Sequence, residues 1–280
     1  MKVIAIAIIT VLLLMGWVRW QEKRAVFFPS RVLEGDPKDA GLSFQDAWFT
    51  SEGGSKLHGW FIPGSSDTTV LWLHGNAGNI SDRLHYLKEF SAHLGVSSFI
   101  FDYRGYGKSE GRPTEKGLYS DTQAAFIWLT EEKGIDPGSV IIYGHSLGSA
   151  PSVELALGGG AGAGGVVLES PLTSAGEMAR RLYGGLPVDL LLSLKLDVVG
   201  QVGKMRMPVM VIHGEEDSVI PFDMGRKVYE AAPEPKTFLP VPGGDHSDCY
   251  LVGGEAYWQA WREFVELALK GRQNTGDRIQ

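Results

Sequence analysis

Short apolar runs alternate along the chain with longer segments in which apolar residues recur every three or four positions. The first pattern is typical of buried strands, and the second of helices packed against a sheet. The predicted strands are 47–50, 57–62, 69–73, 96–101, 140–143, 166–168, 209–212 and 237–239, and the predicted helices are 81–93, 114–132, 149–157 and 257–269. This alternation predicts an α/β fold with a mostly parallel, doubly wound sheet.

The first two predicted strands depart from that alternation. Runs 47–50 and 57–62 are separated only by a short link with two glycines, Gly53 and Gly54. A glycine-containing link between two such runs is typical of a β-hairpin. We therefore expect an antiparallel hairpin at the start of the sheet, followed by parallel strands whose carboxyl ends carry the functional side chains.

Residues 1–20 form the most apolar segment of the chain and have a pattern of their own. Residues 3–18 are apolar apart from Thr10 and Gly16, and Trp17 and Trp20 lie at the end of this run, where interfacial indoles are expected. The sequence predicts a single N-terminal membrane anchor, because no small-residue cleavage site follows the apolar run. A cleaved signal, which would make the protein secreted or periplasmic, is the alternative.

The charges around this segment leave its orientation open. Arg19, Lys23 and Arg24 beyond it favour a cytoplasmic catalytic domain, whereas Lys2 and the α-amino group favour the opposite side. Residues 25–270 are expected to form one globular domain, and 271–280 a polar tail. The oligomeric state is not indicated.

The net charge and the cysteine count exclude some kinds of binding partner and some kinds of site. The 280-residue chain has a formal net charge of −7, so no basic surface favours nucleic acid or anionic lipid. Cys249 is the one cysteine, which excludes an intrachain disulfide and a cysteine-based metal site. We expect neither a metal nor a cofactor.

Candidate chemistry centres on Gly144-His-Ser-Leu-Gly148, between a predicted strand and a predicted helix. A Gly-x-Ser-x-Gly motif in that position is typical of a nucleophile elbow, a sharp turn that projects the serine hydroxyl from the sheet edge. Glycines are needed on both sides because side chains there would collide with neighbouring backbone. Ser146 is therefore the predicted nucleophile.

A serine nucleophile needs a histidine base and a carboxylate that orients it. Of the two histidines downstream of Ser146, His246 lies in a loop between the last strand and the last helix, whereas His213 ends a strand. A loop can carry a base over the elbow, so we predict His246 as the base and a structural role for His213.

The acid is expected one strand before the base loop. Asp217 lies in the turn after strand 209–212 and is the predicted acid. Its neighbours Glu215 and Glu216 could substitute on sequence grounds, and Glu169, after strand 166–168, is the next candidate.

An oxyanion hole needs two preorganised backbone N–H groups. Leu147, directly after the nucleophile, is expected to give one, and Asn76, in the glycine-rich loop after strand 69–73, the other. The glycine-rich segment 104–107 lacks the lysine-serine/threonine ending of a phosphate-binding P-loop, so no nucleotide site is predicted.

Five motifs in order resemble one subfamily of the α/β hydrolases. They are Phe27-Phe-Pro-Ser-Arg31, Leu73-His-Gly-Asn-Ala-Gly-Asn79, Asp102-Tyr-Arg-Gly-Tyr-Gly107, Gly144-His-Ser-Leu-Gly148 and His213-Gly-x-x-Asp-x-x-x-Pro221. The subfamily contains membrane-anchored serine hydrolases, among them eukaryotic protein depalmitoylating thioesterases and bacterial esterases related to serine aminopeptidases and monoacylglycerol lipases. The resemblance implies the α/β-hydrolase fold, a Ser146-Asp217-His246 triad and an oxyanion hole at Asn76 and Leu147.

The resemblance also implies a small lid insertion at about residues 172–206, and it covers roughly 25–270. One feature departs from it, since the eukaryotic depalmitoylases carry an N-terminal cysteine cluster and this chain has only Cys249. The expected activity is cleavage of carboxylic esters or thioesters of a small-molecule or lipid acyl substrate, without a preferred chain length. A peptidase or amidase, and a non-catalytic anchored scaffold, are the alternatives.

Overall fold

The computed structural model describes residues 24–185 and 188–276, together with Ile6, Ile9, Thr10, Gly16 and Glu22. Its centre is an eight-stranded sheet in the order β10-β9-β8-β7-β4-β6-β3-β2. The strands are β2 (Gln45–Thr50), β3 (Lys56–Ile62), β4 (Thr69–Leu73), β6 (Ser97–Phe101), β7 (Val140–His145), β8 (Gly165–Glu169), β9 (Val209–Gly214) and β10 (Lys236–Val241). Each of them overlaps a run that was predicted from its apolar residues.

The sheet is parallel except at β3, which runs antiparallel to both of its neighbours, β2 and β6. Gly53 and Gly54, each with φ of 85°, form the turn between β2 and β3. Such positive φ values are readily adopted only by glycine. The predicted mostly parallel sheet with an antiparallel hairpin at its start is therefore confirmed.

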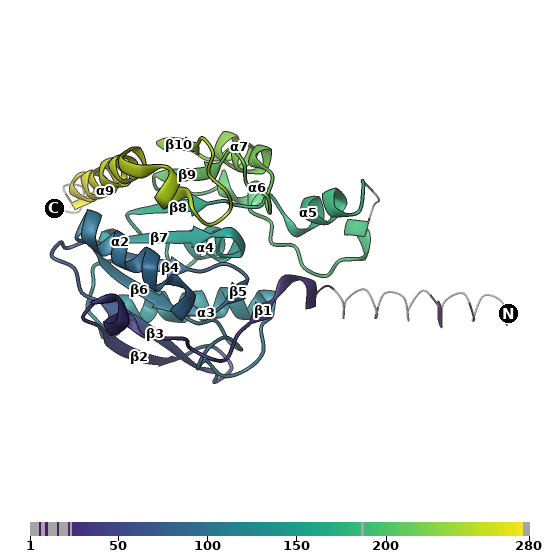
Figure 1. Cartoon of the computed structure of the whole chain (residues 1–280), viewed down its shortest axis with the longest axis horizontal. Coiled ribbons are helices and arrows are strands. Elements are labelled where there is room, and N and C mark those ends of the chain that lie inside the picture. Colours follow the sequence, from purple (N-terminus) through teal and green to yellow (C-terminus); the bar gives the residue numbers. More distant parts are fainter. Residues whose placement is uncertain are drawn as a thin grey trace.

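Helices cover both faces of the sheet and bury an apolar core on each side. One face packs against α3 (Glu115–Ile127), α4 (Ser149–Leu157), α6 (Val199–Val202) and α7 (Phe222–Ala231). The other packs against α2 (Leu84–Leu94), α8 (Cys249–Val252) and α9 (Gly254–Gly276). In Figure 1, α2 and α9 lie together at the left of the molecule. This three-layer arrangement places the carboxyl ends of the parallel strands along one edge of the sheet.

A second, two-stranded sheet lies beside that edge. It pairs β1 (Phe28–Pro29) in parallel with β5 (Ala77–Gly78), and the Phe28 N–H donates to the Asn76 carbonyl at 3.0 Å. The small sheet thus ties the beginning of the domain to the loop that follows β4. Strands of two residues leave no apolar pattern, so the sequence did not predict them.

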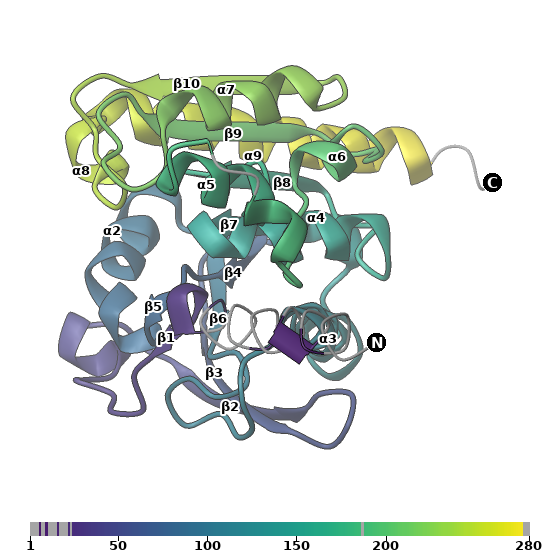
Figure 2. The same ribbon diagram turned by 90° about the vertical axis from the view of Figure 1, so that its right-hand side faces the viewer.

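Residues 172–206 form an insertion between β8 and β9 that contains α5 (Ala175–Leu182), the 3₁₀ turn η6 (Val188–Leu191) and α6. Figure 1 shows α5 in a lobe on the same side of the molecule as the helical residues 24–26, and Figure 2 looks directly at this side. The expected position for a lid is thus occupied by short helices joined by irregular segments.

The predicted anchor, residues 1–20, lies outside the described residues except at Ile6, Ile9, Thr10 and Gly16. Within the part of the chain that the structure describes, no helix is both long enough and apolar enough to span a bilayer.

Candidate active site

The chain reverses sharply at Ser146, between β7 and α4. Ser146 has φ of 56°, a left-handed conformation that is strained for a residue with a side chain. A Cβ on Gly148 would lie 1.9 Å from the Leu73 carbonyl oxygen, and one on Gly144 would lie 2.5 Å from the Gly148 carbonyl oxygen. The glycines are required because backbone fills the space on both sides of the serine, as the motif predicts.

Ser146, His246 and Asp217 form one hydrogen-bonded series. The Ser146 Oγ lies 3.0 Å from His246 Nε2, and His246 Nδ1 lies 2.9 Å from Asp217 Oδ2. They follow three different strands, β7, β10 and β9, whose carboxyl ends meet at the same edge. The Asp217 side chain is fully buried and that of His246 is 14% exposed.

Asp217 is held by donors other than His246. The N–H groups of Val219 and Ile220 donate to Asp217 Oδ1 at 2.9 and 2.7 Å, and His213 Nε2 lies 3.3 Å from Asp217 Oδ2. Burial alone would raise the pKa of the Asp217 carboxyl, but the hydrogen bonds from His213, His246 and Ile220 hold that pKa well below its usual range. The carboxylate therefore stays ionised beside the histidine.

Of the other candidate acids, Glu215 and Glu216 are exposed, and Glu169 lies at the end of β8. Glu169 is buried, and its Oε2 accepts hydrogen bonds from the hydroxyls of Tyr257, Tyr86 and Tyr143 at 2.6, 3.1 and 3.2 Å. Burial raises the pKa of Glu169, although the three phenols counteract it. It has no hydrogen bond to His246 among the described contacts, so the geometry favours Asp217.

Three contacts near His246 were missed by the sequence reasoning. His145 Nε2 donates to the His246 carbonyl at 2.8 Å, and burial lowers the pKa of His145 to about 3, so this ring is neutral. Asp245 Oδ1 accepts from the N–H groups of His246 and Ser218, each at 2.7 Å. Asp245 thus joins the loop that carries His246 to the turn that carries Asp217. His145 and Asp245 adjoin predicted site residues in sequence, but adjacency alone does not indicate a contact.

Asn76 and Leu147 line the same pocket as Ser146. The loop that carries Asn76 lies against the elbow, because a Cβ on Gly75 would be 3.1 Å from His145 Nδ1 and 3.4 Å from Ser146 Cβ. The Tyr106 hydroxyl donates to the Asn76 carbonyl at 2.8 Å. This bond and the one from Phe28 fix the peptide unit that follows Asn76.

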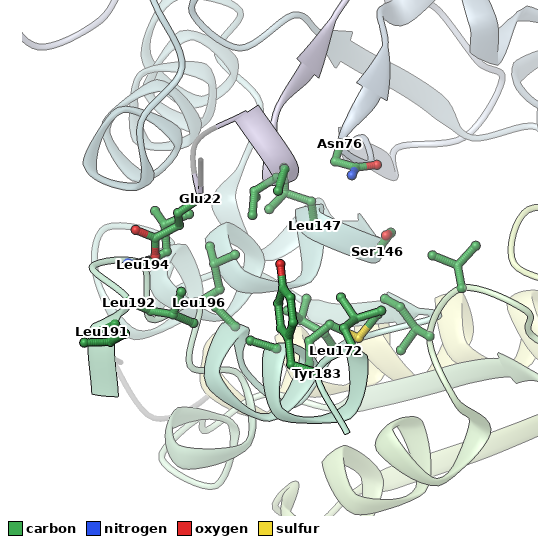
Figure 3. A pocket seen from close by; sticks show the side chains of 18 of the residues that line it. Glu22, Asn76, Ser146, Leu147, Leu172, Tyr183, Leu191, Leu192, Leu194 and Leu196 are labelled. Atoms are coloured by element: carbon green, nitrogen blue, oxygen red, sulfur yellow. Dashed lines mark hydrogen bonds between the residues drawn. The ribbon is translucent and has the colours of Figure 1, made fainter. Parts of the chain in front are cut away.

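The pocket over Ser146 has a volume of about 720 Å³. Figure 3 shows leucines from the insertion on its wall, among them Leu172, Leu191, Leu194 and Leu196. A mostly apolar concave site with a few convergent polar groups is typical of sites for small organic ligands. Among the described residues, no three His, Cys, Asp or Glu side chains are grouped so that they could hold a metal ion.

Residues 68–190 match a protein family described as the alpha/beta hydrolase fold. An uncharacterized protein of Mycobacterium tuberculosis is 35% identical over 256 residues, covering 90% of both chains. The alpha/beta hydrolase domain-containing protein WAV2 of Arabidopsis thaliana is 32% identical, covering 86% of this chain and 85% of its own. This chain belongs to the α/β hydrolase family.

Further similarities agree with this assignment. The human alpha/beta hydrolase domain-containing protein 17B is 37% identical over 204 residues, covering 72% of this chain and 67% of its own. Among solved structures, an esterase of Pyrococcus furiosus matches with a TM-score of 0.70 and 23% identity, covering 86% of this chain and 97% of the esterase. The structural match shows that the two proteins share the α/β hydrolase fold.

Proposed function

We propose that this α/β hydrolase is a serine hydrolase that cleaves carboxylic esters or thioesters of acyl substrates. The observation that carries the proposal is the Ser146-His246-Asp217 series at the base of a leucine-lined pocket. In it Ser146 is the nucleophile, His246 the base and Asp217 the acid, as the sequence predicts. The reaction requires neither a metal nor a cofactor.

The reaction proceeds through an acyl-enzyme. As Ser146 Oγ attacks the substrate carbonyl carbon, His246 Nε2 accepts the hydroxyl proton and then gives it to the departing alcohol or thiol. Water attacks the acyl-enzyme with His246 again as base, which releases the carboxylic acid and restores the Ser146 hydroxyl. Ionised Asp217 stabilises the imidazolium that forms twice in the cycle.

The negative charge on the tetrahedral oxygen is stabilised by the backbone N–H groups of Leu147 and Asn76. Such donors are effective because they are fixed before the reaction begins. The bonds from Tyr106 and Phe28 to the Asn76 carbonyl hold the next peptide unit in place and so limit movement of the loop that carries the Asn76 N–H.

The pocket favours an acyl substrate over a polar one. Leu172, Leu194 and Leu196 are buried and line the pocket that contains Ser146, so an apolar acyl chain that binds there moves from water to an apolar surface. The match to a solved esterase is consistent with ester cleavage by this fold.

A fluorophosphonate probe and a substrate panel test the proposal. We expect the probe to label the unaltered protein at Ser146, Ser146→Ala to abolish labelling and ester turnover, and Ser66→Ala, which removes an exposed hydroxyl, to change neither. The panel consists of chromogenic acyl esters, acyl thioesters and aminoacyl amides. Turnover of amides but not of esters or thioesters would show that the protein is a peptidase or amidase. Equal labelling of Ser146→Ala and the unaltered protein would contradict a catalytic role for Ser146 and favour a non-catalytic scaffold.

We also propose that residues 1–20 anchor the protein in a membrane, on the basis of the apolar run 3–18 and the tryptophans Trp17 and Trp20 at its end. The mass of the purified protein from a membrane fraction tests this. A mature chain that starts beyond Trp20 would indicate a cleaved signal and a secreted or periplasmic enzyme.

A further inference from the structure

A strap of four residues in the insertion, Ser193–Leu196, is held by two glutamates from outside it. The N–H groups of Ser193 and Leu194 donate to Glu22 Oε1 at 2.9 and 2.6 Å, and the Ser193 hydroxyl donates to Glu22 Oε2 at 2.6 Å. The next two N–H groups, of Lys195 and Leu196, donate to Glu115 Oε2 and Oε1 at 3.0 and 2.7 Å. Four successive backbone donors thus end on two carboxylates.

This arrangement replaces secondary structure in the strap. The strap lies between η6 and α6 and belongs to no helix or strand, so its N–H groups require partners of another kind. Hydrogen bonds to a charged acceptor are stronger than those between neutral groups. Glu22 is only 7% exposed, so its bonds are also shielded from competing water.

The two glutamates come from distant parts of the chain. Glu115 is the first residue of α3, and Glu22 precedes β1 in the helical residues that lead into the domain. The strap is therefore fixed to the main body on one side and to the N-terminal segment on the other.

The strap has a direct relation to the pocket. Leu194 and Leu196 are 7% and 2% exposed, and both line the pocket that contains Ser146. Leu196 has φ of 42°, a left-handed conformation that costs free energy in a leucine and persists only where its surroundings impose it. Figure 3 shows Glu22 and Leu194 across the pocket from Ser146 and Asn76.

We propose that Glu22 and Glu115 are positioning residues that fix the strap as the far wall of the acyl-chain site and so determine the length of chain that the enzyme accepts. The inference rests on the proposed acyl hydrolase function. A short acyl group needs only the part of the pocket near Ser146 and Leu147, whereas a long one must reach Leu194 and Leu196. Glu22, in the N-terminal segment, thus lines the substrate site and also holds the strap that forms its far wall.

The test compares Glu22→Gln and Glu115→Gln in the full chain. In Glu115→Gln an NH₂ group replaces an oxygen that accepted the N–H of Lys195 or Leu196, so two donors then face each other. In Glu22→Gln the side-chain oxygen still accepts the two backbone N–H groups and the NH₂ group faces the Ser193 hydroxyl, so this change weakens the bonds by removing the negative charge of the acceptor. We expect kcat/KM for dodecanoyl esters to fall about tenfold, mainly through KM, because an acyl-chain contact is present in both the bound substrate and the transition state. For acetyl esters we expect kcat/KM and the rate of fluorophosphonate labelling to stay within about twofold.

Arg180→Gln is the matched control in the insertion. It removes an exposed ion pair with Asp189, 3.1 Å long, without a contact to the strap, and we expect an unchanged chain-length profile. Thermal unfolding of all variants reports any loss of fold.

Two results would overturn the inference. One is an unchanged ratio of dodecanoyl to acetyl turnover in both glutamate variants, and the other is an equal fall for both esters, which would give the strap only a general structural role. Absence of ester turnover and labelling in the unaltered enzyme would overturn the proposed function first, and the inference with it.

Discussion

Asp217, which follows β9, and Glu169, the last residue of β8, both have buried carboxyl groups, yet their surroundings push their pKa values in opposite directions. Asp217 faces His246 and backbone donors that favour its ionised form. Glu169 faces three tyrosine hydroxyls, and burial has the largest effect on its pKa, which it raises. The two carboxyl groups therefore cannot take each other's role as the acid of a triad, although the sequence left both open as candidates for it.

This difference predicts opposite results for two matched variants. Asp217→Asn puts an amide beside His246 Nδ1, which favours the wrong tautomer, and we expect kcat to fall about a thousandfold or more. Glu169→Gln leaves the base untouched, and we expect kcat to stay within about fivefold while stability falls by about 1–2 kcal/mol. Ester turnover and urea unfolding of the purified variants measure both effects.

An equal loss of turnover in Glu169→Gln, in a variant that is still folded, would assign the acid to Glu169. Near-normal turnover in Asp217→Asn would contradict the proposed triad.

At the scale of elements, the ends of β4 and β6 bring together His74 and Asp102. Both side chains are buried, and His74 Nε2 lies 3.7 Å from Asp102 Oδ1, too far for a direct hydrogen bond. Burial lowers the pKa of His74 to about 3 and raises the pKa of Asp102 to about 8. The pair is thus neutral near neutral pH, directly behind the loop that carries Asn76.

The Asp102 pKa predicts a loss of stability in mild alkali. Between pH 6.5 and 8 the folded protein retains the Asp102 proton that the unfolded chain has released, so the contribution of Asp102 to the free energy of unfolding falls by about 2 kcal/mol as pH rises. His74 and His145 have the opposite effect below pH 6.5. Their lowered pKa values mean that folding releases protons, so their contribution to the free energy of unfolding rises as pH rises. Urea unfolding at pH 6.5 and 8 measures the alkaline loss.

Asp102→Asn is the matched variant for this prediction. The amide oxygen still accepts from the Ile80 N–H, 3.0 Å away in the native protein, but the side chain cannot ionise. We expect its unfolding free energy to change little over the same interval. A parallel decline in both proteins would assign the loss to other groups.

The apolar pattern predicted which elements form but not what ties them together. The predicted strands were found because buried parallel strands are nearly continuous apolar runs. The helix predicted at 257–269 extends to Gly254–Gly276, because polar residues can continue a helix that apolar residues have begun. The β1–β5 pairing and its bond to Asn76 left no signal, since they depend on tertiary position alone.

At the scale of the whole molecule, the same limit applies to the site. The order of Ser146, Asp217 and His246 indicated a common edge, and the structure brings the three together there. The contact between Glu22 and Ser193 joins residues 171 positions apart, and no local pattern indicates it. The roles of His145 and Asp245 as partners of the base loop were missed for the same reason.

The bond between Glu22 and the strap also restricts how the N-terminal segment can vary in length. Glu22 and residues 24–26 are helical, and each residue of a helix turns it by about 100°. One residue inserted between Glu22 and β1 would therefore rotate the carboxylate away from Ser193, even if the segment remained helical. The segment between Glu22 and β1 must therefore have both the right length and the right rotation about the helix axis. A flexible linker of another length could not replace it.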